Sequence, residues 1–276
     1  MQAPANAAQV EYWNARAGLT WVRFQAELDR QIDVLGLAAM QALAPRSGER
    51  ILDIGCGCGQ TSLELAAAVG SQGAVLGVDI SAPMLDVARR RLPGAGAAIE
   101  FRQGDAQTDA FGQPFDAAFS RFGVMFFSDP RAAFENIRRA LRASGRLAFV
   151  CWRPLEDNPW MREPLAAAAP HLPALPPSVP NAPGPFAFAD PETVRTHLTG
   201  AGFARVVIEG YDADIGAGTL EESLALALRV GPLGSAIREH PECEGPVGEA
   251  VRRLLGGYVT PAGVRMRAGV WIVTAQ

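Results

Sequence analysis

The sequence contains no lysine, since all 25 basic residues among its 276 residues are arginine. A Schiff base, a pyridoxal phosphate linkage and the lysine-dependent phosphate-binding loop each need a lysine amine, so these chemistries are excluded. The formal net charge at pH 7 is −4. Because nucleic-acid binding needs a clustered basic surface, we expect no nucleic-acid partner.

Long apolar runs are also missing. No stretch approaches the roughly 18 apolar residues that a membrane span needs, and the first residues lack a basic segment followed by an apolar one. We therefore expect no membrane span and a cytoplasmic location. The sequence gives no indication of the oligomeric state.

Cysteine and histidine are scarce, with four and three residues. No two cysteines have the C-x-x-C spacing of a metal or redox site, so we expect free thiols at all four positions. No histidine belongs to a motif. If the reaction needs a general base, the candidate is His171, which lies in a proline-rich stretch.

The remaining pattern predicts an α/β fold. Short apolar runs that read as buried strands occupy Arg50–Ile54, Ala74–Asp79, Ile99–Arg102, Phe115–Ser120 and Arg146–Cys151. Helical periodicity separates them at 60–69, 82–92 and 130–142, and further helices are expected at 20–44, 191–201, 219–239 and 246–256. Two last strands are expected at Arg205–Glu209 and Arg265–Ala275. This βαβ series predicts a Rossmann-like, mostly parallel sheet with helices on both faces.

The stretch 152–191 differs from the rest because it holds eleven prolines. So many prolines predict an ordered loop or cap with little secondary structure of its own. We divide the chain into an N-terminal helical segment (1–45), a core (46–152), a proline-rich cap insertion (153–190) and a C-terminal part of the core (191–276). The last part carries a helical insertion at 210–264.

The segment from Asp53 to Gln60 runs from a buried strand through a glycine-rich turn into a helix. Glycines at 55, 57 and 59 allow a tight turn and a ligand lying on bare backbone, beside the free N–H groups of the helix. A dinucleotide site has the spacing G-x-G-x-x-G, which would require glycine at position 60. A nicotinamide oxidoreductase is therefore disfavoured, and a nucleoside without a pyrophosphate suits the loop better.

Asp79 ends the next strand, 20 residues after Gly59. A carboxylate at this sheet edge can accept both ribose hydroxyls of an adenosine. The alternative is that Asp79 only caps the helix that starts at Ala82, although Ser81 is better placed for capping.

Together these motifs resemble a class I S-adenosylmethionine-dependent methyltransferase, similar to the ubiquinone/menaquinone C-methyltransferase group. The resemblance implies a seven-stranded sheet whose last strand is antiparallel, a cap formed by insertions, S-adenosylmethionine as cofactor and an N-terminal segment that closes over it. The cofactor contacts that it implies are Tyr12, Trp21, Asp53, Gly55, Cys56, Gly57, Gly59, Asp79, Ile80, Met84, Gly104, Asp105, Ala106, Ser120 and Phe122. For Trp21, packing in the core is an equal alternative.

Departures from relatives restrict the chemistry. Metal-dependent members need acidic ligands after the fourth strand, where this chain has Ser120 and Arg121, so we expect no metal. The Asn/Asp-Pro-Pro-Tyr type of sequence found in amide-methylating members is absent.

We expect a small acceptor that is apolar or carries an aromatic group, methylated on oxygen, carbon or nitrogen. Its apolar walls would be Trp152, Trp160, Phe186 and Phe188, unless these only pack the cap onto the core. A non-catalytic S-adenosylmethionine sensor is the alternative from another class.

Overall fold

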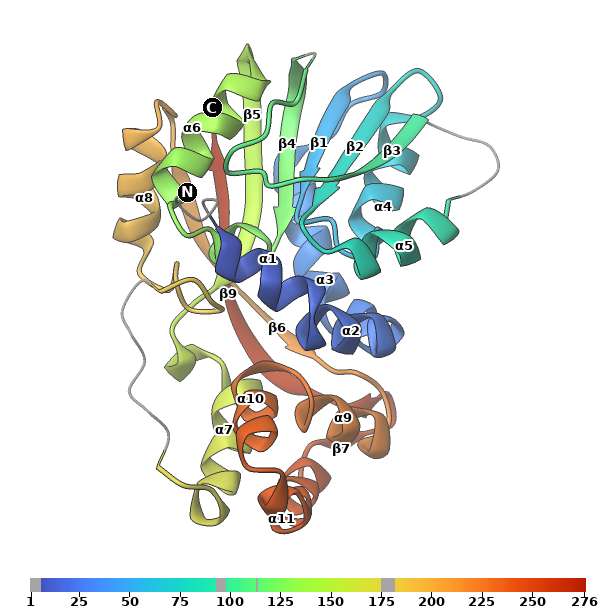
Figure 1. The fold of residues 1–276 in the computed structure, drawn as a ribbon, viewed down its shortest axis with the longest axis vertical. Helices are drawn as coiled ribbons and strands as arrows, with labels where there is room; N and C mark the ends of the chain where they lie inside the picture. The colour runs from blue at the N-terminus through green and yellow to red at the C-terminus, as the bar shows by residue number, and fades with distance from the viewer. Residues whose placement is uncertain (1–5, 93–97, 113, 175–181) are drawn as a thin grey trace.

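A seven-stranded sheet forms the centre of the fold (Figure 1). The structure is a computed structural model, and it describes residues 6–92, 98–112, 114–174 and 182–276. The strand order is β3-β2-β1-β4-β5-β9-β6. The strands are β1 (Arg50–Ile54), β2 (Ala74–Asp79), β3 (Ala98–Gln103), β4 (Phe115–Arg121), β5 (Leu141–Trp152), β6 (Val207–Ile215) and β9 (Met266–Ala275). The first five are parallel, and β9 runs antiparallel to both β5 and β6, so the predicted sheet is confirmed.

Helices cover both faces of the sheet, as Figure 1 shows. The helices that flank it are α3 (Gln25–Leu43), α4 (Gln60–Val69), α5 (Ala82–Arg90), α6 (Pro130–Ala140) and α8 (Pro191–Gly200). Buried side chains of α3, α4, α6, α8 and the strands form one large apolar core, and α5 packs in a separate small cluster with Phe101 of β3. Among the described residues, no helix has both the length and the apolar character needed to cross a bilayer.

The N-terminal segment is divided into three helices. They are α1 (Ala7–Asn14), α2 (Arg16–Arg23) and α3, whereas the sequence pattern predicted one helix over 20–44. Phe24, between α2 and α3, leaves the helical conformation with φ −104° and ψ 23°, and its side chain is buried in a small cluster with Leu28. The periodicity continues through Phe24, so the turn there was not apparent from spacing. In Figure 1, α1 and α2 lie across the lower end of the sheet.

A cap of helices lies below the sheet in Figure 1, where β6 and β9 extend into it. Its elements are α7 (Pro159–Ala168), α9 (Leu220–Ala227), α10 (Gly231–Glu239), α11 (Glu244–Gly256) and the short strands β7 (Val259–Thr260) and β8 (Gly263–Val264). The cap has an apolar cluster of its own, which includes Leu233, Val251 and Leu255. It therefore combines parts of both predicted insertions.

Two expectations about the cap were wrong. The proline-rich stretch was predicted to have little secondary structure, yet it contains α7; its part at 175–181 lies outside the described residues. Pro159 takes the first helical position, where proline fits, and Pro164 is buried in the helix despite the lost N–H. The helix predicted over 219–239 is two helices, because Gly231, the first residue of α10, has φ +73° and is followed by Pro232.

Candidate functional site

The glycine-rich turn after β1 has a backbone that only glycine adopts easily. Gly55, Gly57 and Gly59 have φ values of +66°, +54° and +86°. A Cβ atom at Gly55 would lie 2.8 Å from the Cα atom of Gly123, and one at Gly57 would lie 2.9 Å from the Cε atom of Met84. The turn is therefore packed against its neighbours on both sides, and at Gly57 the neighbour is a cavity-lining side chain.

Asp79 ties this turn to the start of α5. Its Oδ2 atom accepts a hydrogen bond from the Gly57 N–H and its Oδ1 atom accepts one from the Ser81 N–H, both at 2.8 Å. Burial raises the pKa of this carboxyl group. Asp79 lines the main cavity, and each of its oxygens keeps a second lone pair for a ligand. Its position thus suits the predicted contact with ribose hydroxyls.

The N-terminal segment, and not Asp79 or Ser81, caps α5. The Oδ1 atom of Asn14 accepts from the Ala82 N–H at 2.9 Å, and the Nδ2 atom of Asn14 donates to the Ile80 carbonyl at 2.8 Å. The Ser81 hydroxyl makes no capping bond and donates instead to the carbonyl of Trp13 at 2.7 Å. These bonds fix α1 beside the end of β2, next to the turn.

Asp53 supports the turn from inside the core. It is fully buried, and its Oδ2 atom accepts from the hydroxyls of Thr61 and Ser62 at 2.7 and 2.6 Å. Its Oδ1 atom has no hydrogen-bond partner among the described residues. Burial raises the pKa of Asp53 to about 6. Asp53 does not line the cavity, so in this structure it holds the turn against α4.

A charged network closes one side of the cavity. The guanidinium of Arg121 donates to the Oε1 atom of Gln60 at 2.7 Å and to the Oδ1 atom of Asp29 at 3.2 Å. Arg91 donates to the other oxygen of Asp29 at 3.1 Å and to the carbonyl of Cys58 at 2.9 Å. Asp29 and Arg121 line the cavity, and of these two only Asp29 was not expected from the resemblance, which places Ser120 to Phe122 beside the methionyl part of the cofactor.

The end of β4 makes a strained turn beside this network. Phe122 has φ +62°, a left-handed conformation that is uncommon for a bulky residue. Its ring stacks on Trp152 with 4.2 Å between ring centroids. Ser120 is fully buried, and its hydroxyl donates to the Ile54 carbonyl and accepts from the Gly123 N–H. Ser120 therefore supports the turn, while Phe122 faces the cavity.

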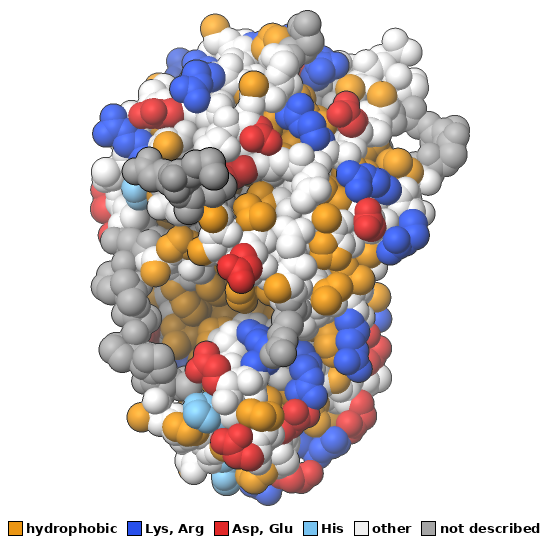
Figure 2. Space-filling model, viewed as in Figure 1, with side chains coloured by type: hydrophobic (Ala, Val, Ile, Leu, Met, Phe, Trp, Pro, Cys, Tyr) orange, Lys and Arg blue, Asp and Glu red, His pale blue; other side chains and the backbone are white. Residues whose placement is uncertain are grey.

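These elements enclose a cavity of about 290 Å³, and Figure 2 shows a hollow with hydrophobic side chains between the sheet and the cap. The sheet edge, α1 to α3 and the cap all contribute to its walls. The predicted cofactor residues that line it are Tyr12, Trp21, Gly55, Cys56, Gly57, Asp79, Ile80, Met84, Gly104, Asp105, Ala106 and Phe122. Three others, Asp53, Gly59 and Ser120, lie outside its lining.

Aromatic rings dominate the part of the cavity away from the turn. Trp13 meets Trp21 and Phe126 edge to face, with centroids 5.9 and 5.0 Å apart, and all three line the cavity. Trp152 lies 5.0 Å from Trp160, ring centroid to ring centroid, and both also line it. The predicted aromatic wall is therefore present at these two tryptophans.

Two of the predicted wall residues lie elsewhere. Phe188 is buried in the core, where its ring packs between Phe134 and Phe149, and Phe186 packs against the same core. Burial of a large ring in the nearest apolar core explains this position, which spacing along the chain does not reveal. His171 is exposed after α7 and lines neither described cavity, so the structure does not bring it to the site.

Comparison with known proteins agrees with this geometry. A family model described as "Methyltransferase domain" matches residues 51–145. The chain is 35% identical over 189 residues to demethylmenaquinone methyltransferase of Clavibacter sepedonicus, covering 65% of this chain and 75% of that protein. It is 36% identical over 118 residues to an aklanonic acid methyltransferase of Streptomyces sp. (strain C5), covering 42% of this chain and about half (54%) of that one.

Solved structures share the fold. The [4+2]-cyclase SpnF superposes with a TM-score of 0.53 at 20% identity, covering 88% of this chain and 80% of that one. The DhpI–SAH complex gives a TM-score of 0.53 at 20% identity, covering 76% and 92%. Together with the relative that matches over three quarters of its length, the glycine-rich turn and the acidic residue after β2 identify the family. This chain belongs to the class I S-adenosylmethionine-dependent methyltransferases, in the group of the ubiquinone/menaquinone C-methyltransferases.

Proposed function

We propose that this methyltransferase acts on a small apolar or aromatic-bearing acceptor that binds between the cap and the carboxyl ends of the strands. The observation that carries the proposal is the wall of Trp13, Trp21, Trp152 and Trp160 around one cavity that also reaches the glycine-rich turn. Aromatic walls with few polar groups suit a flat apolar molecule. The names of two relatives, methyltransferases of demethylmenaquinone and of aklanonic acid, support a small-molecule acceptor.

The cavity residues fit S-adenosylmethionine by charge and by shape. Carboxylates of Asp29, Asp79 and Asp105 line the cavity, which suits a cationic ligand. Asp79 would accept the ribose hydroxyls, Asp105 would meet the adenine amino group and Met84 would pack on the adenine. Arg121 would meet the carboxylate of the methionyl part, because it is the cavity-lining arginine beside the turn.

When bound, S-adenosylmethionine supplies a methyl group on a sulfonium that a nucleophile displaces in line. The protein then has to align the acceptor and exclude water, and it needs little acid–base help. No histidine lines the cavity within the described part of the chain, which agrees with this view. Two thiols, Cys56 and Cys58, do line it, but burial raises the pKa of Cys58 to about 12 and that of Cys56 well above its ordinary value. Both stay protonated and are poor competitors for the methyl group.

The fold alone does not decide between this reaction and others, since a cyclase shares it at a TM-score of 0.53. A non-catalytic sensor would keep the nucleoside site and lack turnover. The acceptor-sized aromatic wall favours an enzyme over a sensor, because a sensor has no use for a second ligand there.

The experiment is a two-step one. S-adenosylmethionine is first titrated calorimetrically into the protein, and S-adenosylhomocysteine release is then followed by mass spectrometry with a panel of phenols, naphthols and aromatic amines. We expect binding together with methylation of at least one aromatic acceptor. Binding with no release for any apolar or aromatic compound would contradict the proposed acceptor class.

A further inference from the structure

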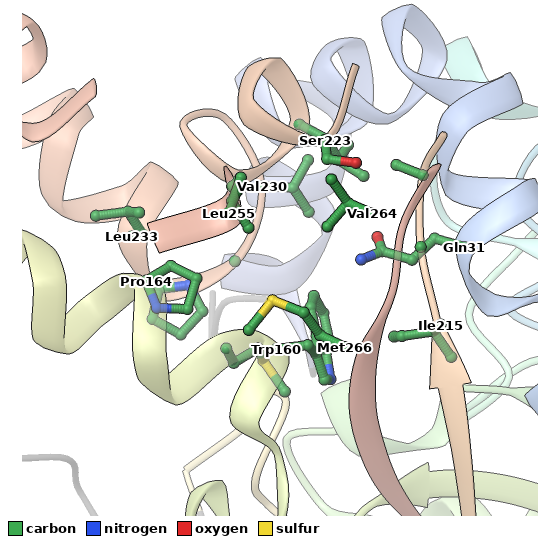
Figure 3. A pocket seen from close by; sticks show the side chains of 17 residues that line it. Gln31, Trp160, Pro164, Ile215, Ser223, Val230, Leu233, Leu255, Val264 and Met266 are labelled. Carbon is green, nitrogen blue, oxygen red and sulfur yellow. The ribbon is translucent and has the colours of Figure 1, made fainter. Parts of the chain in front are cut away.

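A second, smaller cavity adjoins the main one inside the cap (Figure 3). Six residues line both cavities, so the two share a boundary: Gln31, Trp160, Met161, Val230, Gly231 and Pro232. Beyond this boundary the walls come from α7, α9, α11 and the ends of β6 and β9. We call the smaller cavity the side chamber. Its volume is about 60 Å³.

The size of the side chamber limits its occupant. A space of about 60 Å³ holds roughly two or three groups of water or methyl size, taking ~25–30 Å³ for each. Its walls are mostly apolar, with Ile215, Leu255, Val264 and Met266 among them. A short alkyl branch fits this space, whereas a ring or a long chain does not.

Gln31 stands at the boundary with an unused polar group. Figure 3 shows its carboxamide extending from α3 toward Val264 and Met266. It makes no hydrogen bond with any described residue, while the other polar groups nearby are engaged. The Trp160 indole donates to Asn158 at 3.2 Å, and the Ser223 hydroxyl donates to the Gly218 carbonyl at 3.5 Å. A half-buried amide without a partner in an apolar wall is placed to bind a polar atom of a ligand.

We propose that the side chamber binds a short apolar substituent of the acceptor, two or three heavy atoms long, and that Gln31 hydrogen-bonds a polar atom where this substituent joins the ring system. This rests on the proposed function, since the ring system would occupy the main cavity. The class of acceptor is then a flat aromatic compound with a short alkyl branch next to a carbonyl or hydroxyl group. Gln31 is a specificity residue in this arrangement.

Alkyl phenyl ketones test the proposal because each has a ring, a carbonyl group and an alkyl chain in this order. Binding of the series from one to nine chain carbons is measured by calorimetry on the protein saturated with S-adenosylhomocysteine. Each buried methylene strengthens binding about fourfold. We expect this gain to continue up to two or three chain carbons and then to stop.

A filling variant and a matched control sharpen the test. Ala227 lines the side chamber, whereas Ala225 is exposed on the same helix, α9. Ala227→Leu adds three carbons to the chamber wall, which fill the space, so the gain along the series should be lost. Ala225→Leu should behave as the wild type. An affinity that keeps rising through nine carbons, one that ignores chain length, or equal behaviour of the two variants would overturn the proposal.

The role of Gln31 has its own readout. Gln31→Leu should weaken the ketone with three chain carbons about tenfold and leave butylbenzene, which lacks the carbonyl, within about twofold. Equal effects on both ligands would remove the hydrogen bond from the proposal. Failure of the proposed function is recognised separately, because S-adenosylhomocysteine would then not bind or no aromatic acceptor would be methylated, whatever the chain-length series shows.

Discussion

The ring of Phe122 lies almost parallel to the indole of Trp152, at 13° between planes and 4.2 Å between centroids. Phe122 directly follows β4 in a left-handed conformation, and Trp152 is the last residue of β5. The stack joins the ends of two neighbouring strands in the lining of the cavity, which also includes the glycine-rich turn and the aromatic wall. Both rings are nearly fully buried.

This stack should be measurable as a coupling free energy. In a double-mutant cycle of Phe122→Leu and Trp152→Leu, followed by chemical denaturation, we expect a coupling of about 0.5–1.5 kcal/mol in the free energy of unfolding. The control pairs Trp152→Leu with Phe101→Leu on β3, at the far edge of the sheet, and should be additive within about 0.5 kcal/mol. Additivity in the first cycle as well would mean that the stack contributes nothing beyond the burial of each ring.

Asp79→Asn should weaken S-adenosylmethionine binding roughly tenfold to a hundredfold, because a charge-assisted hydrogen bond is worth ~1.5–3 kcal/mol. Isothermal titration gives the dissociation constant. Asp86→Asn removes a carboxylate from the exposed side of α5 and is the control that should bind as the wild type. If both variants bind equally well, Asp79 does not contact the ligand.

Arg121→Met separates recognition of the methionyl carboxylate from recognition of the nucleoside. We expect the variant to bind S-adenosylhomocysteine about tenfold or more weakly, while methylthioadenosine, which has no carboxylate, binds within about threefold. Competition titrations with both ligands measure this difference. Asp29 keeps Arg91 as a partner in the variant, so the network is not left with an unpaired charge. An equal loss for both ligands would show that Arg121 only holds Gln60 and Asp29 in place.

Asp53 should give the folded protein a characteristic pH dependence. Burial raises the pKa of its carboxyl group to about 6 from an ordinary value of 3.8, so the folded state binds the proton more tightly than the unfolded state. Stability from this group is therefore lost as the pH rises from about 4 to about 6, by roughly 3 kcal/mol in full. Above about pH 7 the loss is complete.

Asp53→Asn removes this titration. The free energy of unfolding of the wild type minus that of the variant should fall by up to about 3 kcal/mol between pH 4 and pH 7, as measured by urea denaturation in the absence of ligand. Carboxyl groups with lowered pKa values, such as Glu49 beside Arg146, make the protein more stable as the pH rises. This contribution is the same in the wild type and the variant, so it cancels in the difference between their free energies of unfolding. A difference that does not change with pH would show that Asp53 ionises normally in the folded protein.

The strands beside the cavity and the glycine-rich turn could be predicted from the sequence alone. Strands β1 and β2 have the bounds that the apolar runs predicted, since a strand buried on both faces is recognisable as a continuous apolar run. The tight turn at Gly55, Gly57 and Gly59 was also predictable, because left-handed φ angles favour glycine at the very positions that adopt them. Asp79 was predictable from its position alone, because it ends the parallel strand beside that turn.

Only the tertiary structure decided which distant side chains meet. Asp29 and Arg121 lie 92 residues apart, and nothing near either residue shows that they pair across the cavity. Phe188 was expected in the acceptor wall but is buried in the core. Any nearby apolar environment can bury a ring, and the spacing of residues along the sequence does not say which one does so. Likewise, the amphipathic pattern around Gln31 predicts a helix, and the side chamber exists only because the cap packs against that helix. Local conformational preferences are fixed by each segment, whereas the cavity is made from contacts between segments that no single segment specifies.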